Sequence, residues 1–340
     1  MTHLFFRRAL PLVLCLCLLT GCAPRQPQQY SATYLDLFDT VTTVTGRAES
    51  EAAFQAQAQA IHDALLEYHR LFDIYHTYPG LNNLKTVNDQ AGIAPVPVDP
   101  RITQLLLDCR DYHSLSGGLL NPALGSVLEL WHTARTQSLD DPDHACLPDS
   151  QALAQAADHT DMDRVEIDPE ASTVFLPDGE MSLDVGAVAK GWALQRVCES
   201  APEGLLINAG GNICATGPKD GETPWVIGIQ DPAGGGYLHT LALTRGSVVT
   251  SGDYQRTYQV DGVSYHHIIH PETGYPAELW RSVTVVCPDS GLADALSTTL
   301  FLLPLEAGLA LLETVDAQAM WVAGDGGEYF SPGFEAMLRS

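Results

Sequence analysis

Apolar residues return at helical spacing in a long segment near the start of the chain. Within Glu51–Phe72 they recur every third or fourth position and therefore share one helical face: Phe54, Ala58, Ile61, Leu65 and Phe72. Ser50 stands where an N-cap residue is expected. We predict a helix here, and three more at residues 102–112, 187–199 and 292–303.

A different pattern, rich in β-branched residues, predicts the strands. Residues 34–45 alternate Thr and Val and indicate a first strand. After Arg164, short β-rich runs separated by Gly or Pro predict strands at 165–167, 173–176, 205–208, 225–229, 238–243, 248–250, 265–269 and 283–287. Residues 77–100 and 137–149 are predicted as loops. This order indicates an α+β fold, with mixed or antiparallel sheets and packed helices, rather than repeated βαβ units.

The size and charge of the chain narrow its class. Its 340 residues can bury a large core, as one large domain or as two closely packed lobes, and no solenoid repeat is evident. Lys and Arg total 17 against 42 Asp and Glu, a net charge of −25. Such acidity favours solubility and excludes nucleic acid as a partner, because phosphates demand basic surfaces.

The N-terminus has the pattern of a bacterial lipoprotein signal. Arg7 and Arg8 precede an apolar run over residues 9–19, too short to span a bilayer, and Leu19, Thr20 and Gly21 lead to Cys22. We expect residues 1–21 to be a signal peptide, Cys22 to be lipidated, and residues 22–30 to be a flexible tether. The protein would then be extracytoplasmic and anchored to the cell membrane. An ordinary signal peptide with an incidental cysteine is the alternative.

The remaining cysteines do not indicate a disulfide framework or a zinc site. Of eight, Cys15 and Cys17 fall within the signal and Cys22 would carry lipid. The other five are widely spaced and include no C-x-x-C pair: Cys109, Cys146, Cys198, Cys214 and Cys287. We expect most of them to be small buried residues.

Common catalytic fingerprints are missing from the sequence. It has no P-loop, no G-x-G-x-x-G after a strand and no G-x-S-x-G. His266 and His270 have H-x-x-x-H spacing, but the glutamate of a zinc peptidase is absent.

Two segments contain a strand followed by small residues. In MSLDVGAVAKGWA (residues 181–193), a helix start after Asp184 would offer free N–H groups to an anion, with Lys190 one turn further on. An N-cap Asp and a solvated Lys explain the spacing at least as well. In LINAGGNI (residues 206–213), the Gly-Gly pair permits close approach of a ligand or simply a tight turn.

Two further segments carry candidate chemistry. SGDY at residues 251–254 leads to HHIIHPETG at 266–274, where His267 is a candidate base or a structural residue. In ADALSTTL (293–300), Asp294 and Thr298 share a helical face, and their oxygens suit Mg²⁺. Thr298 could instead bond back to the Asp294 carbonyl. Apolar neighbours favour a partner for this carboxylate.

Taken together and in this order, these segments resemble the ApbE family of FAD:protein FMN transferases. The likeness runs from about Tyr34 to the C-terminal helices, and LDLFDT (35–40) and LFDIY (71–75) also resemble early segments of the family. The resemblance implies that residues 31–340 form a single large α+β domain related to the T-fold, with FAD as substrate and Mg²⁺ as cofactor.

The resemblance also implies roles for individual residues. Mg²⁺ would be held by the Asp294 carboxylate, the Thr298 hydroxyl and the main-chain carbonyl of Ala187. His267 would be catalytic. Residues implied to contact or flank FAD are Phe38, Tyr75, Leu119, Leu120, Asn121, Asp184, Lys190 and Ile269. Two positions depart from the family pattern, because Asn121 and His270 stand where Asp is usual.

The implied reaction moves the FMN half of FAD onto a Thr or Ser hydroxyl of a membrane-associated flavoprotein and releases AMP. Lys190 would offset developing charge, and His267 would accept the hydroxyl proton. A pyrophosphatase that splits FAD with water, or a non-catalytic flavin-binding lipoprotein, uses the same residues, and the sequence does not separate these alternatives. A structural or adhesive lipoprotein would bind no FAD.

Overall fold

The computed structural model describes residues 27–339, so the signal and Cys22 lie outside the described residues. The described chain begins with a hairpin of β1 (Gln28–Leu37) and β2 (Thr40–Ala48). Two predictions are therefore corrected: residues 34–45 are not one strand, and the predicted tether ends earlier, since residues 28–30 already pair with β2. The hairpin turns at Phe38 and Asp39, both with positive φ, which the continuous Thr/Val pattern did not reveal.

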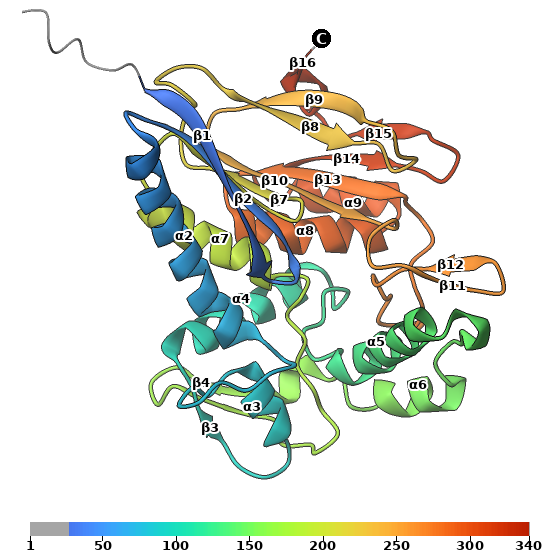
Figure 1. Ribbon diagram of the computed structural model, residues 1–340. Coiled ribbons are helices and arrows are strands. Elements are labelled where there is room, and N and C mark those ends of the chain that lie inside the picture. Colours follow the sequence, from blue (N-terminus) through green and yellow to red (C-terminus); the bar gives the residue numbers. More distant parts are fainter. Residues whose placement is uncertain (1–26, 340) are drawn as a thin grey trace, which may run out of the picture.

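Eight strands form one antiparallel sheet in the order β1-β2-β6-β7-β10-β13-β14-β15 (Figure 1). Its later members are β6 (Leu205–Ala209), β7 (Asn212–Ala215), β10 (Gly246–Gly252), β13 (Ser282–Cys287), β14 (Gln318–Val322) and β15 (Glu328–Phe330). Each neighbouring pair is antiparallel. The predicted α+β class with antiparallel sheets is confirmed, although β14 and β15 were not predicted.

Different layers cover the two faces of this sheet. Helices α2 (Glu51–Phe72), α7 (Ala189–Ser200) and α8 (Ser290–Leu302) lie on one face, with α9 (Leu305–Leu312) after α8 (Figure 1). A small sheet of β16 (Leu338–Arg339), β9 (Tyr237–Leu243) and β8 (Trp225–Gln230) packs on the other face. The prediction of α2 is confirmed to the residue, and Ser50 caps it by accepting from Ala53 N.

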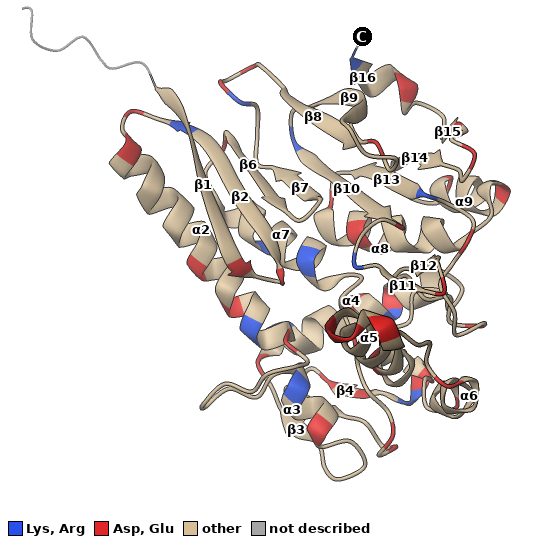
Figure 2. Cartoon of the chain, turned by 45° about the vertical axis from the view of Figure 1, so that its right-hand side comes forward, with Lys and Arg blue, Asp and Glu red and all other residues tan. Residues whose placement is uncertain are grey.

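The rest of the chain packs below the large sheet. It includes α3 (Leu84–Asp89), α4 (Pro100–Leu115), α5 (Gly125–Asp140), α6 (Ser150–Ala157), the strands β3 (Val96–Pro97), β4 (Glu166–Asp168) and β5 (Thr173–Phe175), and the hairpin β11 (Tyr258–Val260)–β12 (Val263–Tyr265). Short 3-10 turns occur at Pro142–His144, Met162–Arg164 and Glu335–Met337. The predicted loop at 77–100 therefore contains α3 and β3, and the loop at 137–149 begins inside α5. The predicted strand at 265–269 is wrong beyond its first residue. Acidic residues are scattered over several helices and loops (Figure 2).

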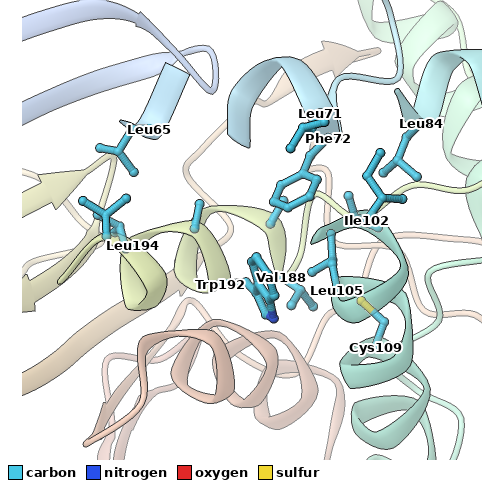
Figure 3. Close-up of a cluster of buried hydrophobic side chains, with 14 of the residues drawn as sticks. Leu65, Leu71, Phe72, Leu84, Ile102, Leu105, Cys109, Val188, Trp192 and Leu194 are labelled. Carbon is cyan, nitrogen blue, oxygen red and sulfur yellow. The ribbon is translucent and has the colours of Figure 1, made fainter. Parts of the chain in front are cut away.

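A continuous core joins α2, α4 and α7. Phe72, Trp192 and Ile102 meet in it, and the rings of Phe72 and Trp192 are 5.7 Å apart (Figure 3). Burial of such large apolar groups fixes the start of α7 against its neighbours. As predicted, most of the five cysteines in residues 27–339 are buried; among these five only Cys146 is exposed, and all are free thiols. No helix among residues 27–339 is long and apolar enough to cross a membrane.

Candidate functional site

A cavity of about 890 Å³ lies where the ends of the central strands meet α5, α7 and α8. This volume is within the range of about 300–1,000 Å³ that is usual for small-molecule sites. Most residues proposed from the sequence line it: Tyr75, Leu119, Leu120, Asn121, Asp184, Ala187, Lys190, His267, Ile269, Asp294 and Thr298. Phe38 is outside this lining. It lies at the tip of the β1–β2 hairpin, where its N–H donates to His69 Nδ1 (3.1 Å), and its neighbours Asp39 and Thr40 line the cavity instead.

The contact of α7 with α8 is exceptionally close at Gly191. A Cβ there would lie 2.3 Å from the Ser290 carbonyl oxygen and 2.5 Å from Asp294 Cβ, so only glycine fits. The approach lets the Gly191 N–H donate to Asp294 Oδ2 (2.9 Å). Gly191 is the third residue of α7, so its N–H is one of the first-turn donors that a helix leaves without a backbone partner. The Ala187 carbonyl lies before the N-cap and accepts no backbone hydrogen bond from the described residues.

Three oxygens of different kinds are thus available in one part of the cavity. Asp294 is 4% exposed, and burial raises the pKa of its carboxyl, which Lys190 and the Gly191 N–H partly oppose. Ser297, not Thr298, donates to the Asp294 carbonyl (2.9 Å), so the structure does not use Thr298 for that bond. Carboxylate, hydroxyl and carbonyl oxygens are ligands that Mg²⁺ accepts.

The oxygen set fits a hard cation better than a transition metal. No three His, Cys, Asp or Glu side chains of residues 27–339 gather as a metal cluster. Thr298 lines the cavity beside Asp294. Asn212 Nδ2 is buried nearby and has no hydrogen bond of ordinary geometry. It is still close enough to Asp294 to lower the pKa of that carboxyl. A single buried carboxylate in such surroundings is costly unless a cation or proton neutralises it.

Asp184 is held in place by hydrogen bonds on both sides. Its N–H donates to the Pro122 carbonyl (2.8 Å), and its Oδ1 accepts from Gly186 N (2.8 Å). The preceding residue, Leu183, forms a paired contact with the Asn88 amide, which donates to the Leu183 carbonyl (2.9 Å) and accepts from its N–H (2.8 Å). Burial raises the pKa of Asp184.

His267 follows the β11–β12 hairpin, and its ring faces the cavity. With Nδ1–H donating to the Gln255 carbonyl (3.2 Å), Nε2 is left as the acceptor. His267 is exposed at the cavity, but the surrounding protein atoms desolvate its ring, and this, then repulsion from Arg256 and Lys190, lowers the pKa of His267 well below its ordinary value. The imidazole is therefore neutral near pH 7 and able to accept a proton. His266, in contrast, is structural: its Nε2–H donates to the Ala277 carbonyl (2.7 Å) and its Nδ1 accepts from Ile268 N.

Comparison with known proteins identifies the family. A sequence model of the ApbE family matches residues 38–321. An FAD:protein FMN transferase of Treponema pallidum is 37% identical over 279 residues, covering 75% of this chain and 75% of that one. The chain belongs to the ApbE family. A second FAD:protein FMN transferase, from Klebsiella pneumoniae, is 32% identical over 273 residues, 75% of this chain and 82% of that one.

Solved structures agree with this membership. The crystal structure of the ApbE protein from Thermotoga maritima has a TM-score of 0.82 at 29% identity and covers 92% of this chain and 100% of that one. The flavin transferase ApbE from Vibrio cholerae has a TM-score of 0.76 at 23% identity over 92% and 100% of the two chains, a likeness of fold. The predicted single α+β domain of ApbE type is confirmed, and the protein is an enzyme of this family.

The two departures from the ApbE pattern have structural roles here. Asn121 donates from Nδ2 to the Thr160 carbonyl (2.8 Å) and accepts at Oδ1 from Ala123 N (2.9 Å). A carboxylate at this position could not make the first of these bonds. His270 accepts from Glu272 N through Nδ1. In a tight turn, its N–H donates to the Tyr275 carbonyl (2.8 Å) and its carbonyl accepts from Gly274 N (2.9 Å).

Three cationic side chains line the cavity, namely Arg135, Arg256 and Lys190, and the sequence analysis proposed only Lys190. In the described part of the chain none of the three forms an ion pair, and Lys190 Nζ contacts only the Gly186 carbonyl (3.4 Å). Burial, then Arg256, lowers the pKa of Arg135. Unpaired cations that face one another in a molecule of net charge −25 favour an anionic ligand.

An aromatic pair flanks the same space. The rings of Tyr75 and His132 are 5.0 Å apart, and burial followed by the Asp184 charge raises the pKa of Tyr75 to about 12. Sequence reasoning missed His132 and Arg135 because it did not predict α5. The recurrence of Leu124, Leu128 and Trp131 at helical spacing was the available signal.

Proposed function

We propose that this enzyme transfers the FMN half of FAD to a Thr or Ser hydroxyl of a partner flavoprotein in a Mg²⁺-dependent reaction that releases AMP. The observation that carries the proposal is the combination within one cavity of an open oxygen set, a neutral His267 and unpaired cations. Each meets a need of phosphoryl transfer: a metal site, a proton acceptor and charge stabilisation.

Asp294, Thr298 and the Ala187 carbonyl would hold Mg²⁺, which when bound neutralises phosphate charge and orients the phosphoryl group. Lys190, Arg256 and Arg135 would contact the pyrophosphate from the remaining sides. Tyr75 and His132 offer aromatic faces on which the ring systems of FAD can stack.

In the proposed step, the acceptor hydroxyl oxygen attacks the phosphorus on the FMN side of the pyrophosphate. The new O–P bond forms as the bond to the bridging oxygen breaks, and AMP leaves with that oxygen. His267 Nε2 takes the hydroxyl proton. Because the Nδ1–H is held by the Gln255 carbonyl, the ring keeps the tautomer that this role requires.

The test uses a purified membrane flavoprotein that carries FMN covalently on Thr, prepared without flavin, together with the enzyme, FAD and Mg²⁺. A gain of one FMN mass on the acceptor and one AMP per transfer supports the proposal. Free FMN without an acceptor adduct indicates FAD hydrolysis and contradicts it. His267→Gln should abolish transfer while FAD still binds, whereas His144→Gln, at an 82% exposed side chain, is the matched control.

We also propose that a lipid on Cys22 anchors the enzyme outside the cytoplasm, near membrane-bound acceptors. The support is the run of residues 9–22, which has the length and the small residues of a lipoprotein signal. Cys22→Ala should move the enzyme from the membrane fraction to the soluble fraction. Retention in the membrane fraction would contradict the proposal.

A further inference from the structure

One face of the large sheet is left uncovered along β1 and β2, and along β6 and β7 the β8–β9 layer covers it only in part, so that Leu206 and Ile213 stay half-buried. The helices cover the opposite face, and β8–β9 lie over the later strands (Figure 1). Because side chains alternate between the two faces of a strand, the uncovered face carries Leu35 on β1 and Val41 on β2. They are 75% and 53% exposed, which is unusual for apolar residues of this size inside strands.

Strand β8 borders this face with an open edge. It ends the three-stranded sheet, and within residues 27–339 no strand pairs with its other side. Val226 on β8 is 52% exposed and Tyr237 on β9 is 71% exposed. The Tyr237 ring lies on Gly228, where a Cβ would be 2.4 Å from the ring. An open strand edge beside exposed apolar groups is a ready site for an added strand.

This surface is continuous with the reaction centre. A groove beside β8 belongs to the same cavity as His267 and Asp294. Half-buried Leu206 and Ile213 form its floor, and its sides are lined by Val41, Val226, Gly228 and Tyr237. We call these six residues the sheet groove. The β6–β7 turn at Gly210–Gly211 lies between the two parts, and a Cβ on Gly210 would collide with Thr40. A chain in the groove therefore leads to the reacting atoms.

The chemistry of the sheet groove suits a protein better than FAD. None of its six residues is charged, in a chain with 59 charged residues (17 + 42). On the neighbouring β1, the carboxylate of Asp36 turns away to His62 (3.0 Å). The strands beside the groove are almost free of charged residues (Figure 2). Charge depletion with an exposed aromatic residue is typical of protein interfaces, whereas phosphates need the cations at the other end of the cavity.

We propose that the sheet groove binds an extended segment of the acceptor protein, which adds as a strand along β8 and places apolar side chains on Leu206, Ile213 and Val226. This inference rests on the proposed transfer function. The six residues of β8 span about 20 Å, enough to align several residues on one side of the acceptor hydroxyl. Main-chain hydrogen bonds to β8 would fix the direction of the acceptor segment and how far it enters the groove, and the apolar contacts would supply affinity.

The test measures transfer to the flavin-free acceptor with Val226→Glu and Tyr237→Ser. Ile93→Glu is the control, because Ile93 is similarly exposed at 69% on the loop between α3 and β3, at the far end of the molecule (Figure 1). Both groove variants should raise the KM for the acceptor by about tenfold or more, with kcat and the FAD dissociation constant unchanged. The melting temperature of each variant verifies that it folds, and Tyr237→Ser removes only surface area if Val226→Glu does not fold.

The results that would contradict the docking surface differ from the result that would contradict the transfer function. Groove variants with the same acceptor KM as Ile93→Glu would overturn the docking surface while leaving the transfer function intact. A weaker affinity for FAD would assign the groove to FAD and also overturn the inference. Absence of transfer by the wild-type enzyme would refute the proposed function itself.

Discussion

Gly191→Ala tests whether the close approach of α7 and α8 builds the metal site. The new Cβ would meet the Ser290 carbonyl oxygen at 2.3 Å, while ordinary contacts begin near 3.4 Å, so the helices must part by about 1 Å. The hydrogen bond from Gly191 N to Asp294 Oδ2, now 2.9 Å, would stretch beyond bonding distance. The same movement separates the Ala187 carbonyl from Asp294 and Thr298.

The expected change in the free energy of unfolding is the difference between two opposing effects of the new methyl group. Overpacking costs about 1–3 kcal/mol, and alanine returns about 1 kcal/mol of helix propensity, so the free energy of unfolding should fall by at most about 2 kcal/mol. At roughly 1.5 °C per kcal/mol for a chain of this size, the melting temperature should fall by at most about 3 °C. Mg²⁺ demands distances near 2.1 Å, so a separation of about 1 Å should raise the half-saturating Mg²⁺ concentration by at least about tenfold.

The assays are thermal unfolding by circular dichroism and the rate of transfer against Mg²⁺ concentration. Gly308→Ala in α9 is the matched control, since its Cβ would meet only side-chain atoms, of Leu300 and Trp321, at 3.2 Å. It should keep the wild-type Mg²⁺ requirement. If Gly191→Ala also kept that requirement, the close approach would not position the metal ligands, and the reasoning would be refuted.

Three further outcomes follow from the site. Because its pKa is lowered, His267 stays neutral as pH falls from 8 through the ordinary value of about 6.5, so kcat/KM for transfer should remain level there; a fall centred near 6.5 would contradict this. Thr298→Val removes one oxygen and should raise the Mg²⁺ requirement about tenfold, whereas Thr298→Ser should retain it; equal requirements would remove Thr298 from the metal set. Asn88→Ala leaves the N–H and the carbonyl of Leu183 unpaired, so the free energy of unfolding measured in urea should fall by about 1–3 kcal/mol. FAD should also bind more weakly, because Asp184 follows Leu183 directly; unchanged FAD affinity would show that the Asn88 hydrogen bonds do not position Asp184.

How far the sequence predicted the fold depended on whether a pattern was local. The periodicity of α2 and its Ser50 cap gave its limits correctly. The same reasoning joined β1 and β2 into one strand, because the turn is made by Phe38 and Asp39 in left-handed conformations without glycine. Strand β14 and helix α5 were missed, although each carries apolar residues that are buried in hydrophobic clusters of their own.

Whether a residue of the site could be predicted also depended on whether its partners are close to it in the sequence. Asp294 and Thr298 could be paired from helical spacing alone, since both lie on α8. His267 could be proposed from the sequence only as a base or a structural residue, and Ala187 entered through the family resemblance alone, because their place beside α8 depends on packing between distant segments. Nothing local indicated that the free first-turn N–H of Gly191 would donate to Asp294, 103 residues later in the chain. The groove beside β8 likewise exists only once two sheets are assembled.

The central claim is transfer of FMN to a protein, and its most direct measurement is the intact mass of the acceptor after incubation with enzyme, FAD and Mg²⁺. We predict a gain of one FMN on a single Thr or Ser, with AMP formed in equal amount, and neither product with Asp294→Asn. An acceptor of unchanged mass beside free FMN and AMP would contradict the claim.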